Sequence, residues 1–106
     1  MAHGRLGAID LPATTYSTVY TVPISTKSTV NVSLANRTAG PINVRLAVGG
    51  ITDIPANSDF VNYDTPLAAY SSLEKKGIAL GAGEKVVVYS SAPGVSVQAQ
   101  GVSVSA

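Results

Sequence analysis

The sequence predicts an all-β protein that folds as a single β-sandwich of about seven to eight short antiparallel strands. Three observations lead to this fold class. Apolar residues alternate with Ser, Thr, Asn and Ala in short runs, Gly and Pro separate the runs, and apolar residues never recur at helical spacing for more than one turn. A chain of 106 residues is also long enough for one hydrophobic core and too short for two.

The first 14 residues show no clear periodicity and contain two glycines and a proline, Gly4, Gly7 and Pro12. We therefore divide the chain into an extended N-terminal arm, residues 1–14, and a β-sandwich domain, residues 15–106. Such an arm can reach a neighbouring molecule, and its candidate contact residues are Arg5, Leu6, Ile9 and Leu11. The alternative is a frayed terminus or an edge segment laid along the domain's own sheet.

Three β-runs follow the arm. Residues 16–22 are rich in aromatic and β-branched residues and end at Pro23, which cannot donate to a sheet ladder. Residues 29–34 show the most regular alternation, with three apolar side chains on one face. Residues 36–41 supply Asn, Gly and Pro for a reversal, so residues 42–48 are expected to pair with 29–34 in an antiparallel hairpin.

The middle of the chain combines an irregular loop with short strands. Residues 49–58 form the longest loop candidate inside the domain. Residues 59–64 form a short strand, and residues 70–73 and 77–80 form either one interrupted strand or two short ones. The strands alone leave two wirings open, a jelly roll and an immunoglobulin-like Greek key.

The last two strands, residues 85–90 and 95–104, flank a Pro-Gly turn. The first is apolar enough to be central. Along the second, the apolar residues change parity, because Val95, Val97 and Ala99 share one phase and Val102 and Val104 share the other. We expect a β-bulge at Gly101 to correct the phase, since glycine accepts the positive φ that some bulges require. The alternative is that the last two valines face outward and pack on another subunit.

Charged residues make up only 12% of the chain, against about a quarter in an ordinary soluble domain. The seven basic residues are scattered and the net charge is +1, so no direct binding of nucleic acid is expected. No apolar run approaches the roughly 20 residues of a membrane-spanning helix, so no membrane partner is expected either. The chain contains no cysteine and can therefore fold in a reducing cytoplasm.

The titratable residues form no catalytic or metal-binding motif. The single histidine lies in the arm, without a rigid scaffold to orient it as a base. The glycine-rich turn at residues 81–85 leads into a strand and lacks the Ser or Thr of a phosphate-binding loop. We therefore predict a protein that is not an enzyme, needs no cofactor or metal, and functions through its surfaces.

Two tyrosines are candidate partner contacts. Tyr63 and Tyr70 lie beside the irregular loops, and an exposed tyrosine offers a flat apolar face with a polar tip. Val102 and Val104 complete the set of candidate contacts. In an alternative function, the loops at 49–58 and 64–72 would contact a host glycan.

Six segments carry a resemblance to a known family. They are Thr18-Val-Tyr-Thr-Val-Pro23, Ser28-Thr-Val-Asn-Val-Ser-Leu-Ala-Asn-Arg-Thr38, Val44-Arg-Leu-Ala-Val48, Tyr63-Asp64, Leu80-Gly-Ala-Gly-Glu-Lys-Val86 and Gly94-Val-Ser-Val97. In these segments the chain resembles small virion structural proteins of tailed bacteriophages, cyanophages among them. The resemblance implies a compact β-sandwich that occurs alone or within tail-fibre, baseplate or head-decorating proteins. It implies no catalytic residues.

Composition and resemblance together predict a non-enzymatic structural protein of a tailed bacteriophage virion. We expect it to oligomerise, with a trimer as one option, and to dock on capsid or tail subunits as a decoration or cement protein or a tail-baseplate component. Its expected location is the virion, assembled in the cytoplasm of the host bacterium. The alternative is a receptor-binding or carbohydrate-binding module of a phage tail fibre.

Overall fold

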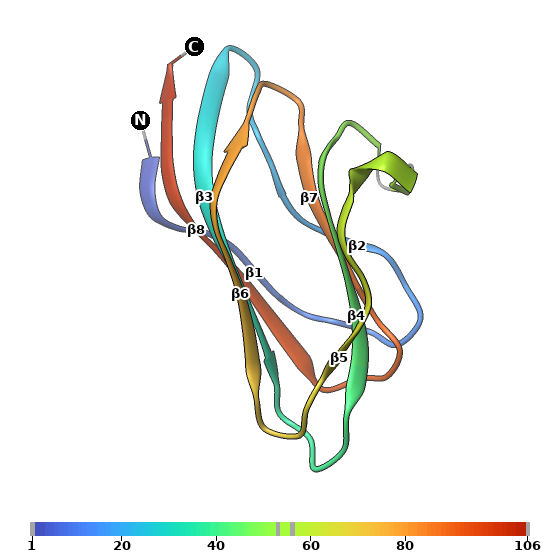
Figure 1. Ribbon diagram of the computed structural model, residues 1–106. Helices are drawn as coiled ribbons and strands as arrows, with labels where there is room; N and C mark the ends of the chain where they lie inside the picture. Colours follow the sequence, from blue (N-terminus) through green and yellow to red (C-terminus); the bar gives the residue numbers. More distant parts are fainter. Residues whose placement is uncertain (1, 53, 56, 106) are drawn as a thin grey trace.

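Eight strands form two four-stranded antiparallel sheets in the computed structural model, which describes residues 2–52, 54–55 and 57–105 (Figure 1). The strands are β1 (Ala2–Asp10), β2 (Ser17–Thr21), β3 (Thr26–Asn36), β4 (Ile42–Gly50), β5 (Phe60–Leu67), β6 (Ser72–Leu80), β7 (Lys85–Ser90) and β8 (Val95–Ser105). A short 3-10 helix, η1 (Asn57–Asp59), precedes β5. The predicted fold class, an all-β single sandwich, is therefore confirmed.

The strand order identifies the wiring as a jelly roll. One sheet has the order β1-β8-β3-β6 and the other β2-β7-β4-β5. The first strand thus pairs with the eighth, the second with the seventh, the third with the sixth and the fourth with the fifth. A chain folded back on itself as one long hairpin and then wrapped into two sheets gives this pattern. Of the two wirings that the sequence left open, the jelly roll is the one observed. The hairpin expected between residues 29–34 and 42–48 was wrong, because β3 and β4 lie in different sheets and the turn between them crosses from one sheet to the other.

The core lies between the sheets and consists of the inward-facing residues of strands in both. The alternation predicted for residues 29–34 is confirmed, because all three apolar side chains of that run are fully buried. The buried core residues are Leu11, Val22, Val30, Val32, Leu34, Ile42, Val44, Leu46, Leu67, Leu80, Val86, Val88, Val95 and Val97. The strand predicted as central, β7, lies between β2 and β4.

The N-terminal segment lies along the domain's own sheet. Strand β1 pairs with β8 from Ala2 opposite Ser103 to Asp10 opposite Ser96. The side chain of Leu11 is only 3% exposed and belongs to the core. Residues 2–10 are thus an edge strand, which is the alternative to a free arm. Pairing with β1 satisfies the outer edge of β8, which would otherwise remain open to another chain.

The β-bulge expected at Gly101 was wrong. Strand β8 keeps a continuous register with β3, from Ser105 opposite Thr26 to Val95 opposite Asn36. Gly101 is instead required by close packing, because a Cβ atom there would collide with the carbonyl oxygen of Thr29. Since the register does not shift, the phase change means that Val95 and Val97 face the core whereas Val102 and Val104 lie on the outer face of the same strand.

A bulge does occur in β6, which is one strand and not two. Between the pairs Val30–Ile78 and Val32–Lys75, strand β6 carries one residue more than β3. Gly77 sits in this bulge with φ of +70°, and its N–H donates to Asn31 Oδ1 at 2.9 Å. The interruption seen in the sequence is therefore a local kink in an edge strand.

The sandwich has two ends that differ in their loops (Figure 1). The lower end consists of the β3–β4, β5–β6 and β7–β8 turns, which cover residues 37–41, 68–71 and 91–94. The upper end consists of the β2–β3, β4–β5 and β6–β7 connections, and the two chain ends also lie there. The long dimension of the molecule is 42 Å. In the described part of the chain, no helix has the length and apolar character needed to cross a membrane.

Candidate interaction surfaces

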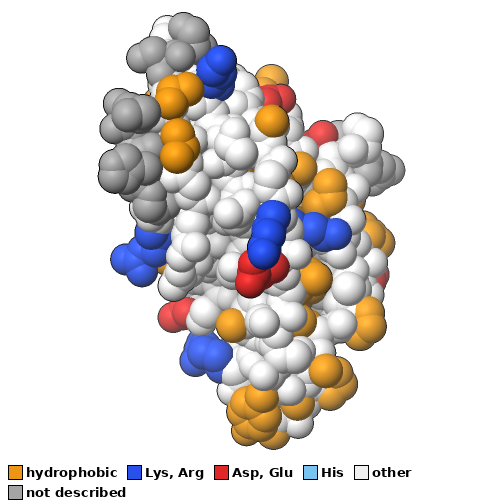
Figure 2. Space-filling view, turned by 60° about the vertical axis from the view of Figure 1, so that its left-hand side comes forward, with side chains coloured by type: hydrophobic (Ala, Val, Ile, Leu, Met, Phe, Trp, Pro, Cys, Tyr) orange, Lys and Arg blue, Asp and Glu red, His pale blue; other side chains and the backbone are white. Residues whose placement is uncertain are grey.

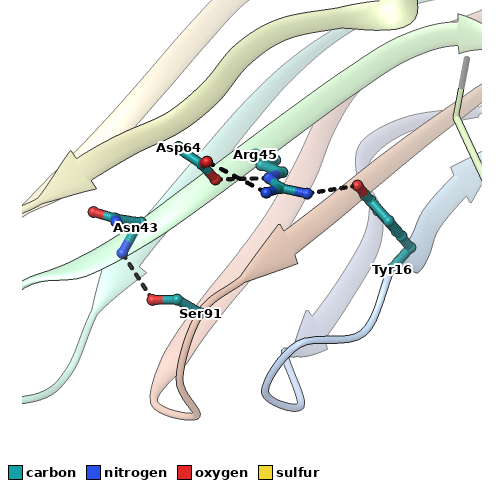
Figure 3. Close-up of polar contacts among 5 residues, drawn as sticks. All are labelled: Tyr16, Asn43, Arg45, Asp64 and Ser91. Atoms are coloured by element: carbon teal, nitrogen blue, oxygen red, sulfur yellow. Dashed lines mark hydrogen bonds and ion pairs between the residues drawn. The ribbon is translucent and has the colours of Figure 1, made fainter. Parts of the chain in front are cut away.

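The outer face of the β2-β7-β4-β5 sheet carries a group of aromatic side chains around Arg45. Figure 3 shows Arg45 between Asp64 and Tyr16. Arg45 Nε donates to Asp64 Oδ1 at 2.7 Å, and Nη2 donates to Asp64 Oδ2 at 3.3 Å. Nη1 donates to the Tyr16 hydroxyl at 2.9 Å. The guanidinium also lies 4.2 Å from the ring centre of Tyr63 and 4.6 Å from that of Tyr89. We call these five residues the Arg45 cluster.

The register of the strands builds the Arg45 cluster. Arg45 of β4 is paired directly with Tyr89 of β7, so the two side chains share the outer face. The next outward pair along these strands, Ala47 and Val87, is buried although it faces away from the core. The outer face of this sheet therefore carries apolar side chains that are shielded from water next to the cluster.

The charges of the Arg45 cluster neutralise each other. The hydrogen bonds from Arg45 hold the pKa of Asp64 below its usual range, although partial desolvation opposes the shift. The same hydrogen bonds, with that to Tyr16, raise the pKa of Arg45. Both groups are therefore charged near neutral pH, which makes them unsuited to proton transfer. Their hydrogen bonds instead join β5, and the segment before β2, to β4.

A buried asparagine organises the lower end. Asn36 Nδ2 donates to the carbonyl oxygens of Gly40, Leu67 and Ala68 at 2.9, 3.0 and 3.2 Å. Its Oδ1 accepts from the N–H and the hydroxyl of Thr38, at 2.9 and 2.7 Å. One side chain therefore ties the β3–β4 turn to the β5–β6 turn, and both turns are held rigidly.

Tyr70 is displayed at the tip of this rigid end. Its side chain is 74% exposed. Its φ is +55°, a left-handed conformation that is unfavourable for a bulky residue, and its N–H donates to the Thr38 carbonyl at 3.1 Å. Figure 2 shows hydrophobic side chains gathered at this lower end. The surrounding structure thus holds a large aromatic side chain outward at some conformational cost.

A shallow hollow of about 250 Å³ lies near the upper end, on the outer face of the β1-β8-β3-β6 sheet. Its lining includes Ala79, Thr29 and Val102, which are neighbours across β6, β3 and β8. Lys27 and Val104, a directly paired couple, complete the upper rim. Lys27 is exposed, and no hydrogen bond or ion pair joins its side chain to any residue that the structure describes.

Three isoleucines protrude from the upper-end connections. Ile24, between β2 and β3, is 89% exposed. Ile51 and Ile54, between β4 and β5, are also largely exposed. Since exposed aliphatic residues of this size contribute nothing to the core, they are candidates for contact with another molecule.

The structure separates the contact residues predicted from the sequence. The contact role predicted for Leu11 was wrong, since its side chain is buried in the core. Leu6 and Ile9 are half-buried and pack against that core, and Arg5 is exposed on β1.

The other predicted contacts reach the surface in three places. Tyr63 is 57% exposed in the Arg45 cluster, and Tyr70 stands alone at the lower end. Val102 and Val104 meet at the hollow, and Val102 faces outward with 44% of its side chain exposed. Sequence reasoning missed Lys27, Asn36 and Arg45, whose roles depend on the register of the sheets.

No protein-family model, curated protein or solved structure matches this chain. Among the side chains that the structure describes, no three His, Cys, Asp or Glu residues come together as a metal site. The exposed side chains at the two ends and on the sheet faces are the features that suggest a function.

Proposed function

We propose that this chain is a non-enzymatic structural protein of a tailed bacteriophage virion. It oligomerises and docks on capsid or tail subunits, as a decoration or cement protein or as a tail-baseplate component. The resemblance of its strand and turn segments to such proteins is one support.

The jelly-roll wiring is a second support, because this architecture recurs in viral capsid proteins. It also recurs in lectin domains and other proteins, so the fold by itself does not assign a function. The surfaces have to carry the argument.

The observation that carries the proposal is the display of large apolar side chains on loops at both ends of a sandwich whose core is complete without them. Tyr70 lies at the lower end, and Ile24, Ile51 and Ile54 lie at the upper end. Only 12% of the residues are charged. A particle subunit gains from such loops, because neighbouring subunits bury them and their apolar area contributes to association.

Particle composition tests the proposal. Density-purified phage particles that encode this chain should contain it in a fixed ratio to the major capsid or tail protein, as measured by mass spectrometry. Antibodies against the chain should label the particles at regular positions in electron microscopy. Absence of the chain from intact purified particles would overturn the proposal.

A receptor-binding or glycan-binding module is the second candidate, and the exposed ring of Tyr63 is the observation that favours it. Binding of the purified chain to a glycan array, lost in Tyr63→Ala and kept in Gln98→Ala on the other sheet, would support this function. A chain that binds no glycan but is present in particles supports the structural role instead.

A further inference from the structure

We propose that Tyr70 of one copy of this chain inserts into the hollow formed by Lys27, Thr29, Ala79, Val102 and Val104 of a second copy. The proposal specifies the contact through which the chain oligomerises, and it rests on that part of the proposed function.

Tyr70 has the properties of an inserting side chain. It protrudes from a turn that Asn36 and Thr38 hold by hydrogen bonds, so little conformational freedom is lost when it binds. The left-handed φ of Tyr70 is a local cost that a glycine at this turn would avoid. A contact made by the outward ring gives a reason to retain a tyrosine at this position.

The hollow suits one side chain better than a free small molecule. Its volume of about 250 Å³ lies below the roughly 300–1,000 Å³ of typical small-molecule sites. Ala79, Val102 and Val104 give it an apolar lining that is shallow and partly open to water.

Charge complementarity points to an aromatic occupant. Lys27 is the charged residue in the lining, and the ammonium of a lysine is attracted to the face of a tyrosine ring. The chain already uses this chemistry once, because Arg45 lies over the rings of Tyr63 and Tyr89. A tyrosine inserted beside Lys27 would give its ammonium a similar partner.

The occupant must come from another molecule, because Tyr70 precedes β6 and Ala79 is near its far end. Residues 72–79 of this extended strand lie between the turn and the hollow and span roughly 25 Å. A contact between opposite ends of two copies is heterologous, so it produces a closed ring or an open filament. One tyrosine buries only about 150–250 Å², so the contact is expected to be weak alone and to gain strength from repetition within an assembly.

Complementing variants test the contact. Tyr70→Ala removes the inserting ring and leaves the hollow intact. Ala79→Glu fills the hollow, places a carboxylate beside Lys27 and leaves Tyr70 intact. Each variant alone should self-associate about tenfold or more weakly than the wild-type chain in sedimentation velocity over a dilution series. Gln98→Glu, on the same sheet face outside the hollow, should associate like the wild-type chain.

The mixture is the decisive measurement. Equal amounts of Tyr70→Ala and Ala79→Glu retain one intact pair of surfaces, so at the highest concentrations of the dilution series, where a single weak contact is populated, the mixture should form dimers and nothing larger. The proposal is overturned if the mixture stays monomeric, if either variant associates like the wild-type chain, or if the wild-type chain is monomeric at every concentration. Circular dichroism of each variant checks that the sandwich remains folded.

The outcomes separate this contact from the proposed function. If particles contain the chain while both variants associate normally, the tyrosine contact is wrong and the virion role stands. If the mixture forms dimers while particles lack the chain, the contact stands and the virion role is wrong.

Discussion

Asp64 and Arg45 form an ion pair with two hydrogen bonds on the outside of the sandwich. Asp64 accepts two hydrogen bonds from the guanidinium, and rings from Tyr63 and Tyr89 lie beside it. The pair links edge strand β5 to β4, while Tyr16 links the segment before β2 to the same guanidinium. A single arginine therefore fixes two elements to the sheet.

The Arg45–Asp64 pair makes stability depend on acid pH. The pKa of Asp64 is lower in the folded protein than the value of about 3.9 of an unfolded chain, chiefly because of the hydrogen bonds from Arg45. Its contribution to the free energy of unfolding is complete above that unfolded value, and is lost as the pH falls through the lower folded pKa. We expect Asp64→Asn to lose less stability than the wild-type chain between pH 6 and about pH 2.

Urea unfolding across this pH range measures the effect. Asp10→Asn is the matched control, because Asp10 is exposed and its ion pair with Arg37 is long, at 3.8 Å. Equal pH dependence in Asp64→Asn and the wild-type chain would contradict the expectation.

At the residue scale, the exposure of side chains could be predicted from the sequence better than the residues that they contact. Tyr63, Tyr70 and Val102 are exposed as a contact role requires, because each lies beside a loop or out of phase with the core. The burial of Leu11 was missed, since no periodicity marks the point at which an end segment turns inward. Arg45 was missed because its partners come from three other segments, and pairing register is not visible in a strand's own pattern.

Strand β8 shows how a glycine permits close packing within a sheet. Gly101 keeps β8 in continuous register with β3 where a Cβ atom would meet the Thr29 carbonyl. The outward face of β8 then supplies Val102 and Val104 to the hollow. The sequence pointed to Gly101 and to the change of phase, but a β-bulge was predicted there and none is present. A bulge and a change in the face that carries the valines produce the same alternation in the sequence.

Gly101→Ala tests the close packing of β3 and β8. The added methyl group must displace the β3 backbone, so we expect a loss of about 2 kcal/mol or more in the free energy of unfolding. Gly40→Ala is the control, because a Cβ atom there meets no atom within 4 Å and should change stability by about 0.5 kcal/mol or less. Denaturant unfolding compares the two variants, and an unchanged midpoint for Gly101→Ala would show that β3 can move away without cost.

At the scale of the whole molecule, the sandwich class follows from strand pattern and turn chemistry, whereas the wiring does not. The alternation of apolar and polar residues predicts each strand, but it does not predict that the first strand pairs with the last. For the same reason, residues 1–14 were predicted to form an extended arm. In the folded chain that segment completes the sheet, and its bulge between Arg5 and Gly7 brings Gly7 against the backbone of Val19 in β2.

Removal of residues 2–10 tests the structural role of β1. The truncated chain should unfold at a lower urea concentration and aggregate more readily, because β8 loses its edge partner and the half-buried Leu6 and Ile9 no longer cover the core. Arg5→Ala is the control, since its exposed side chain contributes little to stability. Denaturant unfolding with light scattering measures both effects. A truncated chain as stable as the full chain would mean that residues 2–10 are dispensable for folding.

The pairing of β1 with β8 also brings the start and the finish of the polypeptide side by side, with Ala2 opposite Ser103 (Figure 1). A few added glycines could join them into a circle without straining any strand. New ends could then be opened in the β7–β8 turn, so that a fluorescent tag or a displayed peptide would leave the molecule from the opposite pole. The same jelly roll would then be attached to a fusion partner through its lower end instead of its upper end.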